Sequence, residues 1–169
     1  MNSKTILAVS LTAVFAVSVF TLPSAFASVG LAKKNPNFDI TDVSGFTMTV
    51  DGIAGSTTPR DQSHVFAYVF VLDTSDETTT RAYAVTSHYA EDSGDVDDDI
   101  AWHTHYVELQ NVCVSSIDDA GTLPTLSEDQ VTAEGASGTV VAGLTAVLNI
   151  DRDAGSVCVQ SVIDVQEAS

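Results

Sequence analysis

Apolar residues in this chain alternate with polar ones or form short blocks, and they do not recur at the three-to-four-residue spacing of a helix. Residues 46–50 alternate strictly and stop at Asp51 and Gly52. The segments 64–73 and 81–90 are rich in Val, Tyr, Phe and Ala on both faces, which is typical of central strands covered on each side. The pattern therefore predicts an all-β fold.

The number and spacing of these segments predict one antiparallel β-sandwich of seven or eight strands, for which a Greek-key order is one option. Further strands are expected at 101–117, 138–150 and 156–165. The sandwich domain should span residues 38–165, between a flexible lead-in (28–37) and a short tail (166–169).

The first 27 residues have the layout of a secretory signal peptide. Lys4 precedes an apolar run from Ile6 to Leu22, and the small-x-small triplet 25–27 follows. Cleavage after Ala27 would leave a secreted or cell-surface protein with no further segment able to span a bilayer. The alternative is an uncleaved membrane anchor, because the apolar run slightly exceeds the usual length of a signal core.

Acidic residues dominate the chain, whose formal net charge is −17. Loss of Lys4 with the leader would leave five Lys and Arg against 23 Asp and Glu, a net charge of −18. Such a surface repels phosphate backbones and attracts cations, so nucleic acid is excluded as a partner. The charge serves either solubility in salty water or the capture of divalent cations.

Cys113 and Cys158, the only two cysteines, each lie in a Val-Cys-Val setting. An even pair in strand-like sequence of an exported protein predicts a disulfide. Neither cysteine has the His and Met neighbours of a blue-copper site, which excludes that class of protein.

The four histidines form the candidate metal site. His103 and His105 lie two apart in a predicted strand, so their side chains share a face. If strands 64–73 and 81–90 form a hairpin whose paired residue numbers sum to about 154, His64 and His88 also share a face, near the same end of the sheet. A cluster of four imidazoles favours copper as the bound metal and zinc as the second candidate. The alternative is that all four make ordinary hydrogen bonds at a sheet edge.

A second candidate cation site lies in the acidic segment 91–99. Asp95, Asp97 and Asp99 alternate there with other residues, and clustered carboxylates suit Ca²⁺. The order of residues does not fit an EF-hand, and the favoured interpretation of this segment is a simple solvated loop.

The sequence lacks a nucleophile elbow, a His-Glu-x-x-His motif, a phosphate-binding loop and a dinucleotide fingerprint. The His-x-His pair in a secreted β-rich chain is similar to copper–zinc superoxide dismutase. The downstream ligands of that family have no counterpart at matching spacing, so its activity is not expected here. The leader "KTILAVSLTAVFAVSVFTLPSAFA", with the acidic, lysine-poor remainder, resembles small exported proteins of marine archaea, which implies an extracellular or cell-surface setting.

The expected function is binding of a transition metal through His64, His88, His103 and His105. The alternative is a non-catalytic surface or adhesion module whose acidic faces meet cations, glycans or other cell-envelope proteins. A secreted enzyme is the least favoured expectation.

Overall fold

The computed structural model describes residues 26, 29–56, 64–74, 79–87, 102–119, 122–151 and 153–169. Within these residues the fold is all-β, as predicted, with no α-helix. The strands are β1 (Gly30–Leu31), β2 (Ile40–Ser44), β3 (Thr47–Val50), β4 (His64–Leu72), β5 (Thr79–Thr86), β6 (His103–Gln110), β7 (Cys113–Asp119), β8 (Thr125–Ser127), β9 (Gln130–Thr132), β10 (Val140–Asp151) and β11 (Ser156–Glu167).

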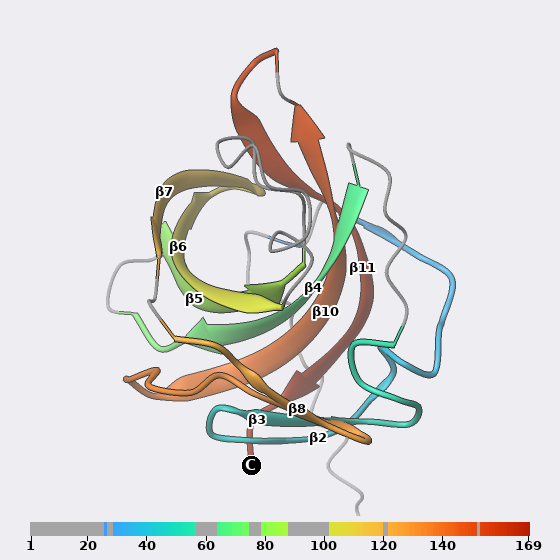
Figure 1. The fold of residues 1–169 in the computed structure, drawn as a ribbon. Coiled ribbons are helices and arrows are strands. Elements are labelled where there is room, and N and C mark those ends of the chain that lie inside the picture. Colours follow the sequence, from blue (N-terminus) through green and yellow to red (C-terminus); the bar gives the residue numbers. More distant parts are fainter. Residues whose placement is uncertain are drawn as a thin grey trace, which may run out of the picture.

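The larger of two sheets curls into a closed ring of strands (Figure 1). Its order is β1-β11-β10-β4-β5-β6-β7, and β7 pairs in addition with β11. We call β11, β10, β4, β5, β6 and β7 the ring, and every neighbouring pair in it is antiparallel. β10 pairs with β4, but between them the chain passes through β5 to β9. Closure of the ring therefore joins segments far apart in sequence.

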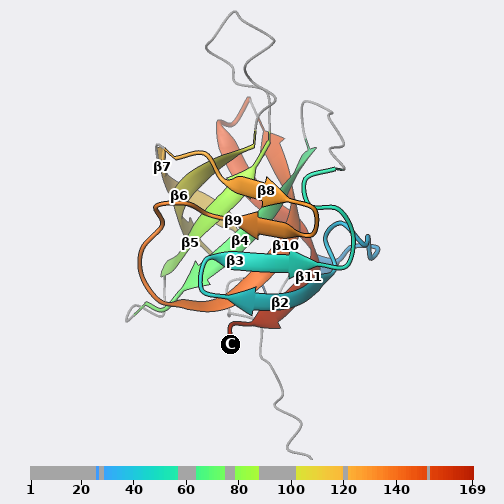
Figure 2. The ribbon, with the colours of Figure 1, turned by 60° about the horizontal axis from the view of Figure 1, so that its bottom comes forward.

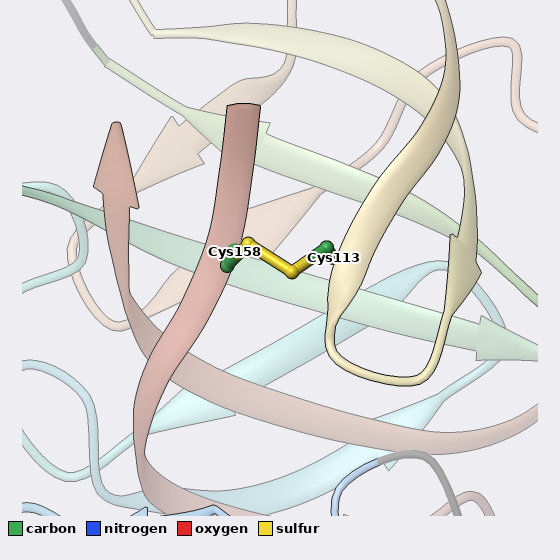
Figure 3. Close-up of a disulfide and its surroundings, with 2 residues drawn as sticks. All are labelled: Cys113 and Cys158. Atoms are coloured by element: carbon green, nitrogen blue, oxygen red, sulfur yellow. A yellow bond between two sulfur atoms is a disulfide. The ribbon is translucent and has the colours of Figure 1, made fainter. Parts of the chain in front are cut away.

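The ring closes at a seam along the edge of β11 that faces away from β10. At this edge Cys158 pairs with Cys113 of β7, and the two residues form a disulfide with Cα atoms 4.0 Å apart (Figure 3). The predicted disulfide is therefore confirmed. Further along the same edge, β1 pairs in parallel with Ser161 and Val162, so it continues the seam where β7 ends its pairing.

Strand β4 is buried on both of its faces, as the sequence predicted for a central strand. Its alternate side chains enter two different apolar cores: Val65, Ala67, Val69 and Val71 join the inner core, and Phe66, Tyr68 and Phe70 join the outer core. The inner core fills the ring, and the outer core lies on the outside of the same strands. Burial of each large side chain stabilises the fold by about 1.5–3 kcal/mol.

A second, four-stranded sheet of order β2-β3-β9-β8 covers part of the outer face of the ring (Figure 2). We call it the cover sheet. Phe38, which precedes β2, packs against β4, with its ring centre 4.9 Å from that of Tyr68 and 4.3 Å from that of Phe66. The outer core is thus shared between the two sheets. An arrangement of two open sheets, as in a sandwich, is not confirmed, because the larger sheet closes on itself.

Both ends of the predicted domain continue into paired backbone. The expected flexible lead-in, 28–37, contains β1, and the expected tail, 166–169, begins within β11. The Ser169 N–H donates to the Val43 carbonyl oxygen at 2.9 Å, and the Ala168 N–H donates to that of Val141 at 3.1 Å.

The Tyr68 hydroxyl holds two backbone segments, at Asn37 and at Gly55, against the outer core. It donates to the Asn37 carbonyl oxygen at 2.8 Å and accepts from the Gly55 N–H at 2.9 Å. The Trp102 indole N–H donates to the Gly55 carbonyl oxygen at 3.3 Å. Burial raises the pKa of Tyr68 to about 12, although the hydrogen bond from Gly55 opposes this shift.

Gly143 of β10 lies directly beneath Val43 and Met48 of the cover sheet. A Cβ added there would be 2.6 Å from a Val43 methyl carbon and 2.8 Å from the Met48 methyl carbon. We expect Gly143→Ala to lower the free energy of unfolding by about 1–3 kcal/mol, as overpacking does. Gly30→Ala is the matched control, because nothing lies within 4 Å of its added Cβ. Equal stability of the two variants in urea unfolding would contradict this account of the interface.

Removal of the disulfide should loosen the seam of the ring. Paired Cys113→Ser and Cys158→Ser substitutions are expected to lower the free energy of unfolding by about 2–4 kcal/mol, measured by urea unfolding without reductant. Treatment of the unsubstituted protein with reductant should give a similar loss. A double variant as stable as the oxidised protein would show that backbone pairing alone holds the seam.

Ionisation of Tyr68 should make the fold sensitive to alkali. Its pKa of about 12 in the folded protein, against 10.0 ordinarily, means that folding favours the neutral phenol. This preference contributes about 2–3 kcal/mol to the free energy of unfolding below pH 10, and the contribution is lost as pH rises through 12. Stability measured from pH 9 to 12 should fall less steeply for Tyr68→Phe. Parallel pH profiles for the two proteins would refute the assignment.

Candidate functional site: a histidine pair inside the ring

His103 and His105 lie together on the inner face of the ring. They begin β6 and alternate with Thr104, in phase with Val107 and Leu109, which belong to the inner core. Their ring centres are 4.6 Å apart, and the ring planes meet at 88°. Both side chains are half-buried, whereas Thr104 between them is fully buried on the other face. The prediction that the two imidazoles share a face is confirmed.

The neighbouring strand leaves room for this pair. Opposite His103 in the β5–β6 register is Thr86, and opposite His105 is Ala84. Residues directly opposite each other in an antiparallel pair place their side chains on one face, so each imidazole faces a small side chain. The Thr86 hydroxyl donates to the Phe66 carbonyl oxygen at 3.1 Å. This end of the ring is thus more polar than the interior beyond Ala84.

His64 lies on the opposite face from the pair. Paired residues of β4 and β5 have numbers that sum to 153, as in Ala67 with Thr86, and not to the predicted 154. The register prediction is therefore wrong by one residue, and one residue reverses the face of every side chain. His64 falls in phase with Phe66 of the outer core, while Val65 belongs to the inner core.

The other predicted ligands cannot be placed in the same way. His88 and the acidic residues Asp95, Asp97 and Asp99 lie outside the residues that the structure describes. Cys113 and Cys158 are joined to each other, so neither offers a thiolate. In the described part of the chain, no group of three or more His, Cys, Asp or Glu side chains is close enough to hold a metal ion.

One contributor to the interior of the ring was not found from the sequence. Phe26 is 1% exposed and belongs to the inner core, although it lies in the segment interpreted as a leader. Its neighbours in sequence have the small-x-small pattern of a cleavage site, and that pattern carries no sign of a packing role.

Comparisons with protein-family models, with curated proteins and with solved structures found no match for this chain. Among the described residues, no helix has the length and apolar character needed to cross a membrane.

Proposed function

We propose that this protein is an exported metal-binding protein that takes up copper, or zinc as second choice, through His103 and His105. The observation that carries the proposal is the close approach of the two imidazoles, 4.6 Å between ring centres, on one face of one strand. Small side-chain rotations would bring one nitrogen of each ring to a shared ion. Imidazole is a preferred ligand of both metals.

Two imidazoles do not complete a metal site, because zinc takes four ligands and Cu²⁺ prefers a tetragonal set. We include His88 as a further ligand on sequence grounds. In sequence it lies two residues beyond Thr86, which is the last residue of β5 and the partner of His103 in the register. Water or carboxylate oxygen would supply the rest. His64 is left out of the proposed set, because it is in phase with the outer core.

Two further properties support this function. The net charge of −17 raises the local concentration of cations around the protein. The disulfide is typical of an oxidising compartment, in agreement with the export that the leader predicts. Calcium binding by the segment with Asp95, Asp97 and Asp99 remains the less favoured alternative.

Titration of untagged protein with Cu²⁺ at neutral pH, followed by calorimetry and electron paramagnetic resonance, tests the proposal. Loss of a residue that only orients a metal ligand lowers metal affinity roughly 10–100-fold. His103→Ala and His105→Ala should each lower Cu²⁺ affinity by more than this, because each removes a ligand itself. Their spectra should show fewer coupled nitrogens. Affinity should also fall as pH drops, because protonated imidazole cannot bind a metal.

His64→Ala is the matched control and should bind Cu²⁺ like the unsubstituted protein. Joint replacement of Asp97, Asp98 and Asp99 by Asn should weaken binding only slightly, through the lost negative field. If the Asp changes abolish binding and the His changes do not, the cation site is the acidic segment. If neither set of changes matters, the metal proposal fails and the acidic surface module is favoured.

A further inference from the structure

Phe26 is the member of the inner core that comes from the N-terminal segment, one position before the predicted cleavage residue Ala27. Its side chain is 1% exposed within the inner core. The Val29 N–H donates to the Phe26 carbonyl oxygen at 3.0 Å in a local turn, and the backbone that follows is tied to the seam, where the Ala32 N–H donates to the Val162 carbonyl oxygen at 2.7 Å. Phe26 therefore enters the interior from a segment fixed against β11.

The wall around this interior is built from aliphatic side chains. Phe26 is the only aromatic residue among the described members of the inner core, and five of the others are alanines: Ala67, Ala82, Ala84, Ala142 and Ala146. Aromatic side chains otherwise gather in the outer core. Alanine at five of the fourteen other described positions, with valine or leucine at the rest, leaves space that one phenyl group occupies.

We propose that cleavage after Ala27 removes Phe26 from the ring and leaves a binding site for one small apolar molecule of about the size of a phenyl ring. The proposal rests on the predicted cleavage and is independent of metal binding. Removal of a buried aromatic side chain leaves a cavity wherever the surroundings cannot collapse. Apolar cavities of this kind stay dry and take up benzene-like molecules.

The closed sheet makes collapse of the wall difficult. Ala146 in β10 illustrates this, because it pairs with Ala67 on one side and with Val162 on the other. Inward movement of such a strand would break hydrogen bonds on both of its edges. The seam is held by the disulfide as well. The inner wall should therefore keep its shape after Phe26 has left.

The test uses the protein as it is secreted, with its N-terminus first determined by intact mass. Benzene near saturation should raise the thermal unfolding midpoint by about 2–5 °C, because the ligand binds only the folded state. Phenol should raise it clearly less, since its hydroxyl would be buried in a dry apolar site. Secreted protein that retains Phe26, no effect of benzene, or equal effects of benzene and phenol would each overturn the proposal.

A substitution that fills the site from the wall separates specific from general binding of benzene. Ala146→Leu should abolish the benzene effect, whereas Ala154→Leu, which makes the same change at an exposed turn position, should preserve it. An undiminished benzene effect in folded Ala146→Leu protein would show that benzene binds elsewhere. If that variant does not fold, the comparison of benzene with phenol on the unsubstituted protein still decides.

Discussion

The pairing of β7 with β11, secured by the bond between Cys113 and Cys158, determines the rest of the structure. It turns an open sheet into a ring and so creates an inside and an outside. It also removes a free sheet edge that could pair with other chains. The inner core, the position of the histidine pair and the surface available to the cover sheet all depend on this closure.

The two cores differ in side-chain size because they lie on opposite sides of a curved wall. Alanine and valine dominate inside the ring, where inward-pointing side chains converge. Outside, side chains diverge and leave space for Phe38, Tyr68 and Phe70 beneath the cover sheet. His103 and His105 lie inside, at the end where the lining changes from alanine to Thr86.

Local patterns predicted the parts of this fold that depend on neighbours in sequence. The apolar residues on both faces of β4 and the shared face of His103 and His105 could be derived from side-chain alternation. The partner of Cys113 followed from the count of cysteines. The register of the β4–β5 hairpin could not be derived, because one extra residue in a loop moves His64 to the other face. Ring closure and the burial of Phe26 also depend on contacts distant in sequence.

The place of β11 in the chain has a consequence for folding during synthesis. β11 follows the other described strands in the chain, and it pairs with β10, β7 and β1, so the ring cannot close until β11 has been synthesised. Until then β4 exposes apolar side chains on two faces, and chains in such a state readily associate. Mutual repulsion between strongly acidic neighbours would oppose that association. The acidic composition thus protects the incomplete chain from association during the interval before β11 joins the ring.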